Sequence, residues 1–386
     1  MKVIWPCPWF GDYRVPVFEE LNKLFEHNFK VFYSKQDVTQ SVDSKMIKRL
    51  GDSTEGLIGK TIRIGDHSSD FANKDLIIRY QPGLYKKIKD FDPDIIIVEA
   101  FGGWSMIGIL YGVLHRKKIM LFYERTAYVE RNSPWWRTLY RKIIGKAVDA
   151  FLINGQLTRE YLENGLGFKK QPKTEGLMVA DSKGLEKAVN SFSDEKKNEL
   201  KRSLQLNSGL IYLFVGQIVE RKGIIQLLGA WEKHIQQHTE DNLIVIGTGI
   251  LLDQLRHKYK DFQSIHLLGR VEYDKVYTYY AIANVFVMPT LEDNWCLVVP
   301  EAMACKLPIA CSIYNGGHLE LIKEGENGYR FDPMKKESII DILDRFHHAD
   351  LVKMGNLSYS IIQEFTPEIA AKKIYNACIN VFLSNK

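Results

Sequence analysis

The sequence has no apolar run long enough to cross a membrane as a helix. The uncharged stretch at residues 100–114 has 15 residues and includes four glycines, whereas a spanning helix needs about 20 predominantly apolar residues. The opening residues, MKVIWPCPWF, lack the apolar core and small-residue cleavage site of a secretory signal peptide. These absences argue against a membrane-spanning or secreted protein, and we expect a cytoplasmic one.

The sequence also lacks the cysteine patterns of disulfide frameworks and zinc sites. It holds five cysteines, an odd number, and no two are spaced as Cys-x-x-Cys. Small secreted domains rely on paired cysteines, and structural zinc sites rely on closely spaced ones. We therefore expect reduced, mostly buried thiols at Cys7, Cys296, Cys305, Cys311 and Cys378.

Neither charge is present in strong excess. The formal net charge is +5, 26% of the residues are charged and 45% are hydrophobic, which are ordinary values for a soluble globular protein. We expect no nucleic-acid partner.

A local basic excess lies in the first half of the chain. Residues 101–150 contain 9 Lys/Arg against 3 Asp/Glu, and within residues 128–146, YVERNSPWWRTLYRKIIGK, the cations are interleaved with aromatic side chains. Such a segment suits the surface of an anionic membrane. It equally fits a solvated helix face with a few buried aromatics, and both interpretations stand at this point.

Short β-branched runs alternate with amphipathic stretches of helical length along the chain. This alternation is typical of parallel sheets built from βαβ units, so the predicted fold class is α/β. Strands are expected at KVIW (2–5), KVFYS (30–34), DIIIVEA (94–100), KIMLFY (118–123) and AFLIN (150–154), and again at LIYLFVG (210–216), LIVIGTG (243–249), IHLLGRV (265–271), VFVMPT (285–290) and PIACSI (308–313).

A polar stretch at residues 169–199 separates these two sets of strands. A chain of 386 residues is also too long for one ordinary core. We predict an N-terminal Rossmann-like domain at residues 1–175 and a C-terminal one at residues 176–365. Open α/β sheets bind ligands at the carboxyl ends of their strands, so we expect both domains to face a central cleft.

The segment LFVGQIVERKGI, residues 213–224, has the pattern of a phosphate-binding turn. A strand leads to Gly216, the cations Arg221 and Lys222 follow, and Gly223 opens a helix. Helix-start amides, a glycine turn and cations together neutralise and bind phosphate. Taken alone, the segment also fits a surface turn with a solvated basic pair.

The segment VMPTLEDNWCLVVPEAMACKLPIACS, residues 287–312, contributes two acids eight residues apart. Asp293 precedes a helix expected from about Leu297 to Cys305, and Glu301 lies one turn inside it. Carboxylates can accept two hydrogen bonds from neighbouring sugar hydroxyls, and the helix-start amides of residues 295–298 could face phosphate or sugar oxygens. A helix cap at Asp293 and a solvated helical Glu301 are the alternatives.

With these motifs the sequence resembles family 4 of the retaining glycosyltransferases, the glycosyl transferases group 1, over nearly the whole chain. The family pattern Glu-x7-Glu matches with Asp293 in the first place, and its Gly–Arg–Lys-Gly pattern matches VGQIVERKG with Gln217 in place of the usual Arg. A downstream glycine pair and acid match at Gly316, Gly317 and Glu320. The resemblance implies the GT-B fold, with a C-terminal helix at residues 366–386 that crosses back to the N-terminal domain.

The resemblance also implies roles for individual residues. Glu301 would bind the ribose hydroxyls, Lys222 and Arg221 the diphosphate, and Asp293 the hydroxyls of the donor sugar. Residues 269–271 would flank the base. Asp293 is one methylene shorter than the usual Glu, and Gln217 lacks the charge of Arg, so Arg221 would share the phosphate neutralisation. The implied donor-binding set is Gly11, Arg14, Gly216, Gln217, Arg221, Lys222, Gly269, Arg270, Val271, Asp293, Asn294, Trp295, Cys296, Leu297, Val298 and Glu301.

In the N-terminal half the candidates are fewer. The first βα loop places Gly11 and Arg14 where the family's loop approaches the donor phosphates and the acceptor. Where the family often has a His near the anomeric centre, this chain has Tyr123, Glu124 and Arg125. Glu124 is the candidate for polarising the acceptor or stabilising positive charge on the sugar, unless it forms a structural ion pair with Arg125 or another cation. The catalytic candidates are thus Glu124, Asp293 and Lys222.

Two further patterns receive little weight. FDPD at residues 91–94 contains Asp-x-Asp, which holds a metal in other glycosyltransferases, but here it precedes a buried strand as a turn does. GTG at residues 247–249 is half of a dinucleotide fingerprint without its third glycine. We expect neither a metal nor a nicotinamide cofactor.

The expected activity is transfer, with retention, of a sugar from a nucleoside-diphosphate donor to a glycan or lipid-linked acceptor in cell-surface polysaccharide synthesis. Family frequency favours UDP as the carrier. Two alternatives remain at this stage: a nucleotide-sugar 2-epimerase of the same fold, and a non-catalytic nucleotide-binding partner of a membrane assembly.

Overall fold

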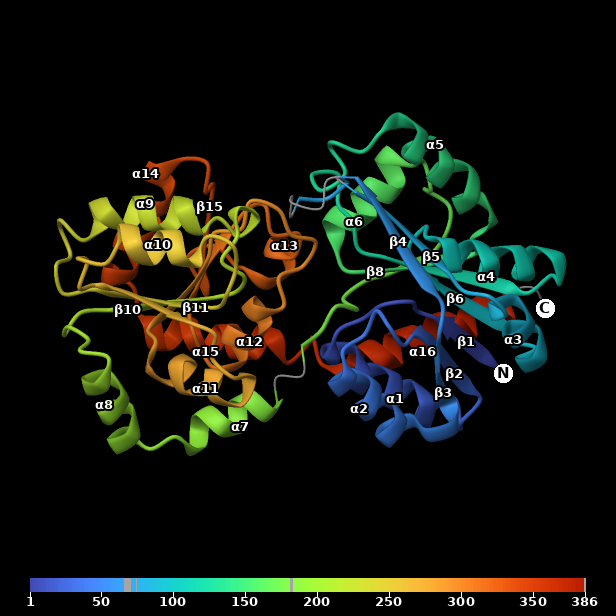
Figure 1. Ribbon diagram of the computed structural model, residues 1–386, viewed down its shortest axis with the longest axis horizontal. Coiled ribbons are helices and arrows are strands. Elements are labelled where there is room, and N and C mark those ends of the chain that lie inside the picture. The colour runs from blue at the N-terminus through green and yellow to red at the C-terminus, as the bar shows by residue number, and fades with distance from the viewer. Residues whose placement is uncertain (66–70, 74, 181–182, 385–386) are drawn as a thin grey trace. The chain divides into compact units, whose positions relative to one another are not determined.

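The computed structural model describes residues 1–65, 71–73, 75–180 and 183–384 (Figure 1). The chain forms two compact units. Unit 1 comprises Met1–Val179 and Phe365–Lys386, and unit 2 comprises Ala180–Glu364. The first boundary thus falls four residues after the predicted one.

Unit 1 is built on a seven-stranded, all-parallel sheet. Its strand order is β3-β2-β1-β6-β7-β8-β9, the order of a doubly wound nucleotide-binding fold with one strand added. The strands are β1 (Val3–Pro6), β2 (Phe29–Ser34), β3 (Thr54–Leu57), β6 (Ile95–Glu99), β7 (Lys118–Tyr123), β8 (Ala150–Ile153) and β9 (Lys173–Thr174). A separate antiparallel hairpin joins β4 (Lys60–Gly65) to β5 (Asp75–Tyr80).

Alternate side chains of each strand point to opposite faces of this sheet, and the side chains on both faces are buried. Val3 and Trp5 belong to one apolar core, and Ile4 belongs to the other. The helices of unit 1 are α1 (Val15–Leu24), α2 (Gln40–Leu50), α3 (Leu84–Phe91), α4 (Gly103–Leu114), α5 (Trp135–Ile144), α6 (Gln156–Glu160) and α16 (Pro367–Leu383).

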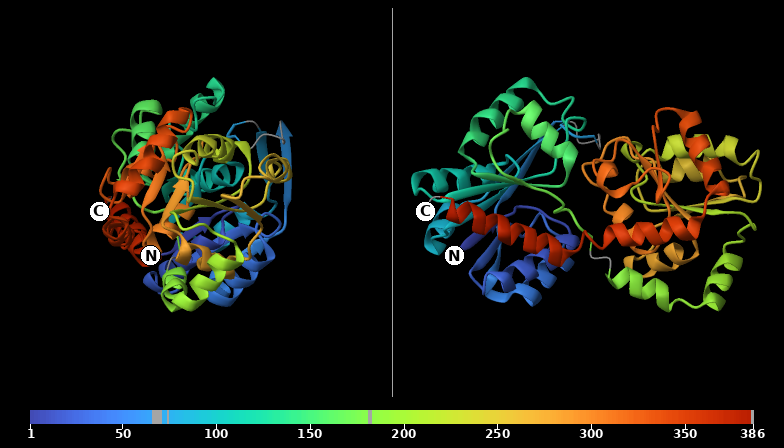
Figure 2. Two further views of the ribbon diagram at one scale, coloured as in Figure 1. Left: turned by 90° about the vertical axis from the view of Figure 1, so that its left-hand side faces the viewer. Right: turned by 180° about the vertical axis from the view of Figure 1, so that it is seen from behind.

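The C-terminal helix α16 belongs to unit 1, although unit 2 precedes it in the chain (Figure 2). Its side chains Ala370, Ile374 and Cys378 are buried in the same core as Val3 and Trp5. The last residues of the predicted helix, 385–386, lie outside the described residues.

Unit 2 is built on a six-stranded parallel sheet with the order β12-β11-β10-β13-β14-β15. Its strands are β10 (Ile211–Val215), β11 (Asn242–Ile246), β12 (Ile265–Gly269), β13 (Val285–Met288), β14 (Ile309–Ser312) and β15 (Gly328–Phe331). Its helices are α7 (Lys183–Ser191), α8 (Asp194–Ser203), α9 (Ile224–His234), α10 (Leu252–Lys258), α11 (Tyr273–Ile282), α12 (Val298–Ala304), α13 (His318–Leu321), α14 (Lys336–Arg345) and α15 (Leu351–Ile362).

All ten predicted strands are present, and the α/β prediction with two Rossmann-like domains is confirmed. The strands that sequence patterns missed are β3, β4, β5, β9 and β15. They are short edge strands or belong to the hairpin, where side chains such as Ile62 and Tyr80 are exposed. Edge and two-sided exposed strands carry no strong apolar pattern.

Within the described residues, no helix has the length and apolar character needed to cross a membrane. All five cysteines are free and buried, as expected.

Candidate functional site

The order of the strands in unit 2 reverses between β10 and β13. Strands β11 and β12, which follow β10, lie on one side, and β14 and β15, which follow β13, lie on the other. The loops after β10 and β13 therefore separate and leave room for a ligand at the carboxyl edge of the sheet. The first loop carries Arg221 and Lys222, and the second carries Asp293. The fold therefore brings the two sequence motifs together.

Gly223 fixes how these loops meet. It has φ of 70°, and a Cβ at this position would lie 1.8 Å from the carbonyl oxygen of Pro289. A side chain is excluded, because backbone oxygen cannot yield by that amount. The start of α9 is thereby held directly against the end of β13.

The two cations of the first loop are fixed on the second loop. The Nη1 of Arg221 donates to the carbonyl oxygen of Glu292 at 2.8 Å, and the Nζ of Lys222 lies 2.5 Å from Oδ2 of Asp293. The same carboxylate oxygen is 3.6 Å from Arg221. One carboxylate and two cations thus form a compact, mostly buried cluster with an excess of positive charge.

Both ends of the short ion pair are charged at neutral pH. Burial lowers the pKa of Lys222, but Cys296 and Asp293 together raise it by more. Burial likewise raises the pKa of Asp293, but Lys222 and Arg221 outweigh this effect and hold it below its usual range. The cluster therefore presents cationic donors that are held in place before any anion arrives.

Asp293 is held by backbone contacts on both sides. Its Oδ1 accepts a hydrogen bond from the amide of Trp295 at 3.1 Å, and its backbone bonds to Tyr314 and Gly316. Asn315, between those two residues, accepts hydrogen bonds from the amides of Cys296 and Gly317 through its Oδ1. Asn315 is a positioning residue that sequence reasoning missed, although it lies directly before the glycine pair that was recognised.

The expected amides at the start of α12 are only partly available. Those of Trp295 and Cys296 are occupied by the side chains of Asp293 and Asn315. Of the four predicted amides, those of Leu297 and Val298 have no hydrogen-bond partner within the described part of the chain. Fewer backbone amides are therefore available to a ligand than predicted, because the loop uses two of its N–H groups to hold its own shape.

Glu301 lies in the first turn of α12 and is half-buried. Its Oε2 accepts a hydrogen bond from the hydroxyl of Tyr280 at 3.2 Å. Tyr280 is almost fully buried, so this contact restricts the carboxylate to one orientation. A carboxylate held in this way keeps lone pairs for a pair of hydroxyl donors.

The other predicted donor residues occupy the same carboxyl edge. Gln217 follows Gly216 and is exposed. Gly269 ends β12, and Arg270, directly after it, is in an exposed ion pair with Glu272. The GTG segment has a packing role: a Cβ on Gly247 would lie 1.7 Å from the carbonyl oxygen of Gly216. This glycine lets the loops after β10 and β11 pack together.

Two buried polar atoms at this edge have no hydrogen-bond partner among the described residues, namely Nε of Arg221 and Oδ1 of Asn294. Unsatisfied buried polar groups cost about 1 to 3 kcal/mol each. Such groups are uncommon and often mark functional sites.

Unit 1 has its own buried charge cluster at the corresponding edge. The guanidinium of Arg14 donates to Glu99 at 3.0 Å and to Glu124 at 3.1 Å. Glu99 ends β6 and also accepts a hydrogen bond from the indole of Trp5 at 3.1 Å. Burial lowers the pKa of Arg14, but Glu99, Tyr13, Cys7 and Glu124 together raise it by more, so the guanidinium stays charged.

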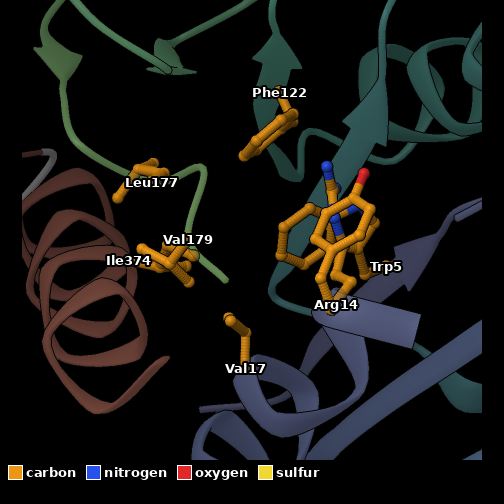
Figure 3. A pocket seen from close by; sticks show the side chains of 8 residues that line it. Trp5, Arg14, Val17, Phe122, Leu177, Val179 and Ile374 are labelled. Atoms are coloured by element: carbon orange, nitrogen blue, oxygen red, sulfur yellow. The ribbon is translucent and has the colours of Figure 1, made fainter. Parts of the chain in front are cut away.

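Apolar side chains surround this guanidinium (Figure 3). Its central carbon lies 4.2 Å from the ring centre of Phe122 and 5.5 Å from that of Trp5. The hollow beside it is lined by Trp5, Tyr13, Arg14, Val17, Phe122, Leu177, Val179 and Ile374. Arg14 is thus a buried anchor that orients Glu124, and its predicted contact with donor phosphate stays a prediction.

Glu124 does form an ion pair, but the partner is Arg14. Arg125 contacts Glu130 instead, at 2.9 Å. Glu124 retains partial exposure at 27% of its side chain, so the ion pair does not remove it from reach of a substrate. Gly11 lies nearby in extended backbone, and its carbonyl oxygen accepts a hydrogen bond from the amide of Arg14.

Sequence reasoning missed two further residues at this edge. Glu99 looked like the end of a buried strand, although a carboxylate at the carboxyl end of a parallel strand is itself a signal. Trp9, in the loop after β1, is 54% exposed. An exposed indole in a ligand-facing loop is a suitable surface for a sugar ring.

The Asp-x-Asp pattern has a structural role. Asp94 accepts a hydrogen bond from the amide of Lys2 at 2.7 Å, and Asp92 pairs with Lys117 at 2.7 Å. Both acids precede β6 and therefore lie at the amino edge of the sheet, away from Arg14 and Glu124.

Comparison with known protein families gives one match, which covers part of the chain. Residues 195–358 match the family model described as "Glycosyl transferases group 1". This region contains Arg221, Lys222, Asp293 and Glu301, and it lies within unit 2.

Several curated relatives are similar to part of the chain. An uncharacterized glycosyltransferase of Methanocaldococcus jannaschii is 32% identical over 165 residues, 40% of each chain. The alpha-monoglucosyldiacylglycerol synthase of Acholeplasma laidlawii is 28% identical over 198 residues, 50% of this chain and 48% of its own. The chain thus spans about half or less of the length of these relatives.

Solved structures are similar over the whole chain. A glycosyltransferase from Rickettsia africae has a TM-score of 0.75 at 12% identity and covers 100% of this chain and 99% of its own. The Anabaena protein Alr3699/HepE in complex with UDP has a TM-score of 0.74 at 12% identity, with coverage of 98% and 100%. The fold is that of the two-domain GT-B glycosyltransferases, and together with the family match in unit 2 these likenesses support a glycosyltransferase.

Proposed function

We propose that the protein transfers a sugar from a nucleoside-diphosphate donor to a glycan or lipid-linked acceptor. The observation that carries this proposal is the cluster of Arg221, Lys222 and Asp293 beside Glu301, at the strand-order reversal of unit 2. Cations, a sugar-binding carboxylate and a second oriented carboxylate are the groups that a nucleotide sugar needs.

In this proposal Lys222 and Arg221 stabilise the negative charge that develops on the leaving diphosphate. Donors that are fixed in advance act without reorganisation during the reaction, which makes them effective catalytic groups. Asp293 orients Lys222 and accepts hydrogen bonds from the donor sugar, and Glu301 accepts them from the ribose. The positive charge comes from side chains, so we propose a transfer step without a metal. We propose retention at the anomeric carbon from the resemblance to the retaining glycosyltransferases.

The donor and acceptor classes rest on similar proteins. Solved structures of the Anabaena protein contain UDP and UDP-glucose, which favours a UDP-sugar. One relative is named an alpha-monoglucosyldiacylglycerol synthase. Another, of Salmonella typhimurium, is named a lipopolysaccharide 1,2-N-acetylglucosaminetransferase. We assign acceptor binding to unit 1, with Glu124 as the group that polarises the acceptor and Trp9 as an apolar surface for its sugar.

A thermal-shift panel of nucleoside diphosphates and nucleotide sugars tests the donor site. A ligand that binds only the folded state stabilises it by about 2.7 kcal/mol at 100 times its Kd, which raises the Tm of a unit of this size by about 5 to 10 °C. We expect UDP or a UDP-sugar to give such a shift and Glu301→Ala to abolish it.

Glu337→Ala is the matched control. Glu337 lies in the first turn of α14, as Glu301 does in the first turn of α12, so both changes alter helix electrostatics alike. Glu337 is exposed and lies outside the proposed site. A wild-type protein that responds to no nucleoside diphosphate would disprove the donor site. Release of free nucleoside diphosphate in the presence of acceptor separates a transferase from a binding partner.

We also propose that unit 1 contacts an anionic membrane through α5. Trp135, Trp136, Leu139 and Ile143 are 76%, 46%, 48% and 57% exposed, and their spacing places them on one helical face. Lys142, Lys146, Lys169 and Lys170 lie around the hollow beside Leu139 and Ile143. Exposed aromatics within a basic rim suit the headgroup region of anionic lipid.

Vesicle sedimentation tests this surface. Wild-type protein should bind vesicles of phosphatidylcholine with phosphatidylglycerol more strongly than phosphatidylcholine alone, and salt should weaken that binding. The double change Trp135→Ser, Trp136→Ser should lower the affinity at least about tenfold through lost apolar burial. Ile250→Ser removes an equally exposed apolar side chain from unit 2 and should have no effect. Unchanged binding of the tryptophan variant would exclude this surface.

A further inference from the structure

A second cluster of titratable side chains lies in unit 2, outside the site described above. His234, Asp241 and His347 each place one ligand-type atom within 4.8 Å of the others. His234 ends α9, Asp241 directly precedes β11, and His347 follows α14. His234 and Asp241 are seven residues apart in the chain, whereas His347 lies 106 residues after Asp241, so the fold brings His347 to the other two.

The topology of the unit explains where they meet. Helices α9 and α14 follow β10 and β15 and run back to the amino edge of the sheet, where β11 begins. The two helices also pack against each other (Figure 1). The cluster is therefore at the sheet edge opposite Lys222 and Asp293, and no step of the proposed transfer uses it.

The geometry of the three groups is that of a ligand set. The Nε2 atoms of His234 and His347 lie 2.8 Å and 2.7 Å from the same oxygen, Oδ2 of Asp241. The other oxygen, Oδ1, accepts a hydrogen bond from the amide of Leu210 at 2.8 Å. A carboxylate that is oriented by the backbone through one oxygen presents the other as a single-oxygen ligand, as carboxylates in metal sites do.

The surroundings allow a cation to enter and to stay. The side chains of His234 and Asp241 are 1% and 2% exposed, whereas His347 is 22% exposed. Two ligands are thus rigidly buried, and the third lies at the entrance. A neighbouring ring, His238, stacks on His347 at 3.8 Å and binds Asp344 at 2.9 Å, which supports the ring of His347 and places a second carboxylate nearby.

We propose that His234, Asp241 and His347 bind one divalent transition-metal ion of the zinc type. Imidazole and carboxylate ligands suit Zn²⁺, which takes nitrogen and oxygen ligands at about 2.0 to 2.2 Å in tetrahedral geometry. Tetrahedral ligands at that distance are about 3.3 Å apart, so each of the two histidine nitrogens moves about half an ångström away from Oδ2 of Asp241 on binding. Solvent at the exposed side of His347 supplies the fourth ligand.

Binding requires each ligating Nε2 to lose its proton, which moves to Nδ1 of the same neutral ring. For His234 no hydrogen bond within the described chain competes at Nδ1. The ion then ties the end of α9, the start of β11 and the segment after α14 together. Its effect is to stabilise unit 2, because a metal that binds only the folded state adds its binding free energy to folding.

Metal uptake by the full chain tests the proposal. After chelator treatment, the protein should bind one Co²⁺ with the visible absorption of tetrahedral cobalt, and Zn²⁺ should displace it. Zn²⁺ at about 100 times its Kd should raise the Tm by about 5 to 10 °C. Loss of a residue that only orients a ligand weakens metal binding about 10- to 100-fold, so His347→Gln should weaken it by more than about 100-fold.

His348→Gln is the matched control, because His348 is the next residue and is exposed. It should leave cobalt binding and the zinc shift unchanged. His347 is partly exposed, so its glutamine variant should fold, which far-ultraviolet circular dichroism checks. The proposal is overturned if the wild type takes up no Co²⁺, or if His347→Gln binds it as the wild type does. Because nucleotide shifts report the opposite edge of unit 2, failure of one proposal leaves the other standing.

Discussion

Replacement of Lys222 by methionine is expected to lower the rate of sugar transfer by about 100- to 1,000-fold. The ammonium group is mostly buried at the start of α9 and is fixed 2.5 Å from Asp293, so it acts as a preorganised charge on the leaving diphosphate. Removal of one such fixed donor from other enzymes has an effect of this size on kcat. Steady-state kinetics with a UDP-sugar donor measure it, and exposed Lys260→Met should retain wild-type activity.

Stability must be separated from catalysis in this variant. Methionine at 222 leaves the carboxylate of Asp293 buried with only the more distant Arg221, and a broken buried pair costs up to about 3 to 5 kcal/mol. The double variant Lys222→Met, Asp293→Asn removes both charges, so its Tm should recover toward the wild type while its activity stays low. If activity recovered together with stability, Lys222 would have a structural role only.

Replacement of Arg14 by methionine is expected to destabilise unit 1 by about 3 to 5 kcal/mol. Arg14 is 5% exposed and pairs with Glu99 and Glu124 at once, so its replacement takes this cation from both carboxylates, of which Glu99 is the more deeply buried. For a unit of this size the Tm should fall by about 6 to 20 °C. Calorimetry or circular dichroism measures the change.

The partner variant Glu124→Gln distinguishes the roles of this cluster. It keeps the shape of the side chain and leaves Arg14 paired with Glu99, so we expect a much smaller loss of stability. If Glu124 polarises the acceptor, transfer should fall while the thermal shift with donor persists. A variant that transfers sugar at the wild-type rate would show that Glu124 only balances the charge of Arg14.

The local elements of this fold could be predicted because buried parallel strands have a strong signature. Runs such as DIIIVEA and LIVIGTG each contain four consecutive apolar, mostly β-branched residues, since both faces of a parallel sheet are covered. The strands that escaped prediction, β4, β5 and β15 among them, are exposed or lie at an edge. These strands are not buried on both faces, so they lack the continuous apolar run by which a buried strand is recognised.

The candidate site divides in the same way. Arg221, Lys222, Asp293 and Glu301 could be found because each has a fixed offset from a strand end or a helix start. Each of these residues can be recognised from a short segment of the sequence. Sequence reasoning missed Asn315, Glu99 and Trp9, which have no such local pattern, and it could not tell that the amides of Trp295 and Cys296 hold the loop itself.

By itself the sequence determined the α/β class, the two-domain organisation and the phosphate and carboxylate motifs, because these depend on periodicity and spacing within about 30 residues. Only the tertiary structure decided which charges meet. The pairing of Lys222 with Asp293, of Arg14 with Glu99 and Glu124, and of His347 with Asp241 joins residues far apart in the chain. Coulombic and hydrogen-bond energies depend on distances of a few ångströms, and those distances are set by strand order and loop packing.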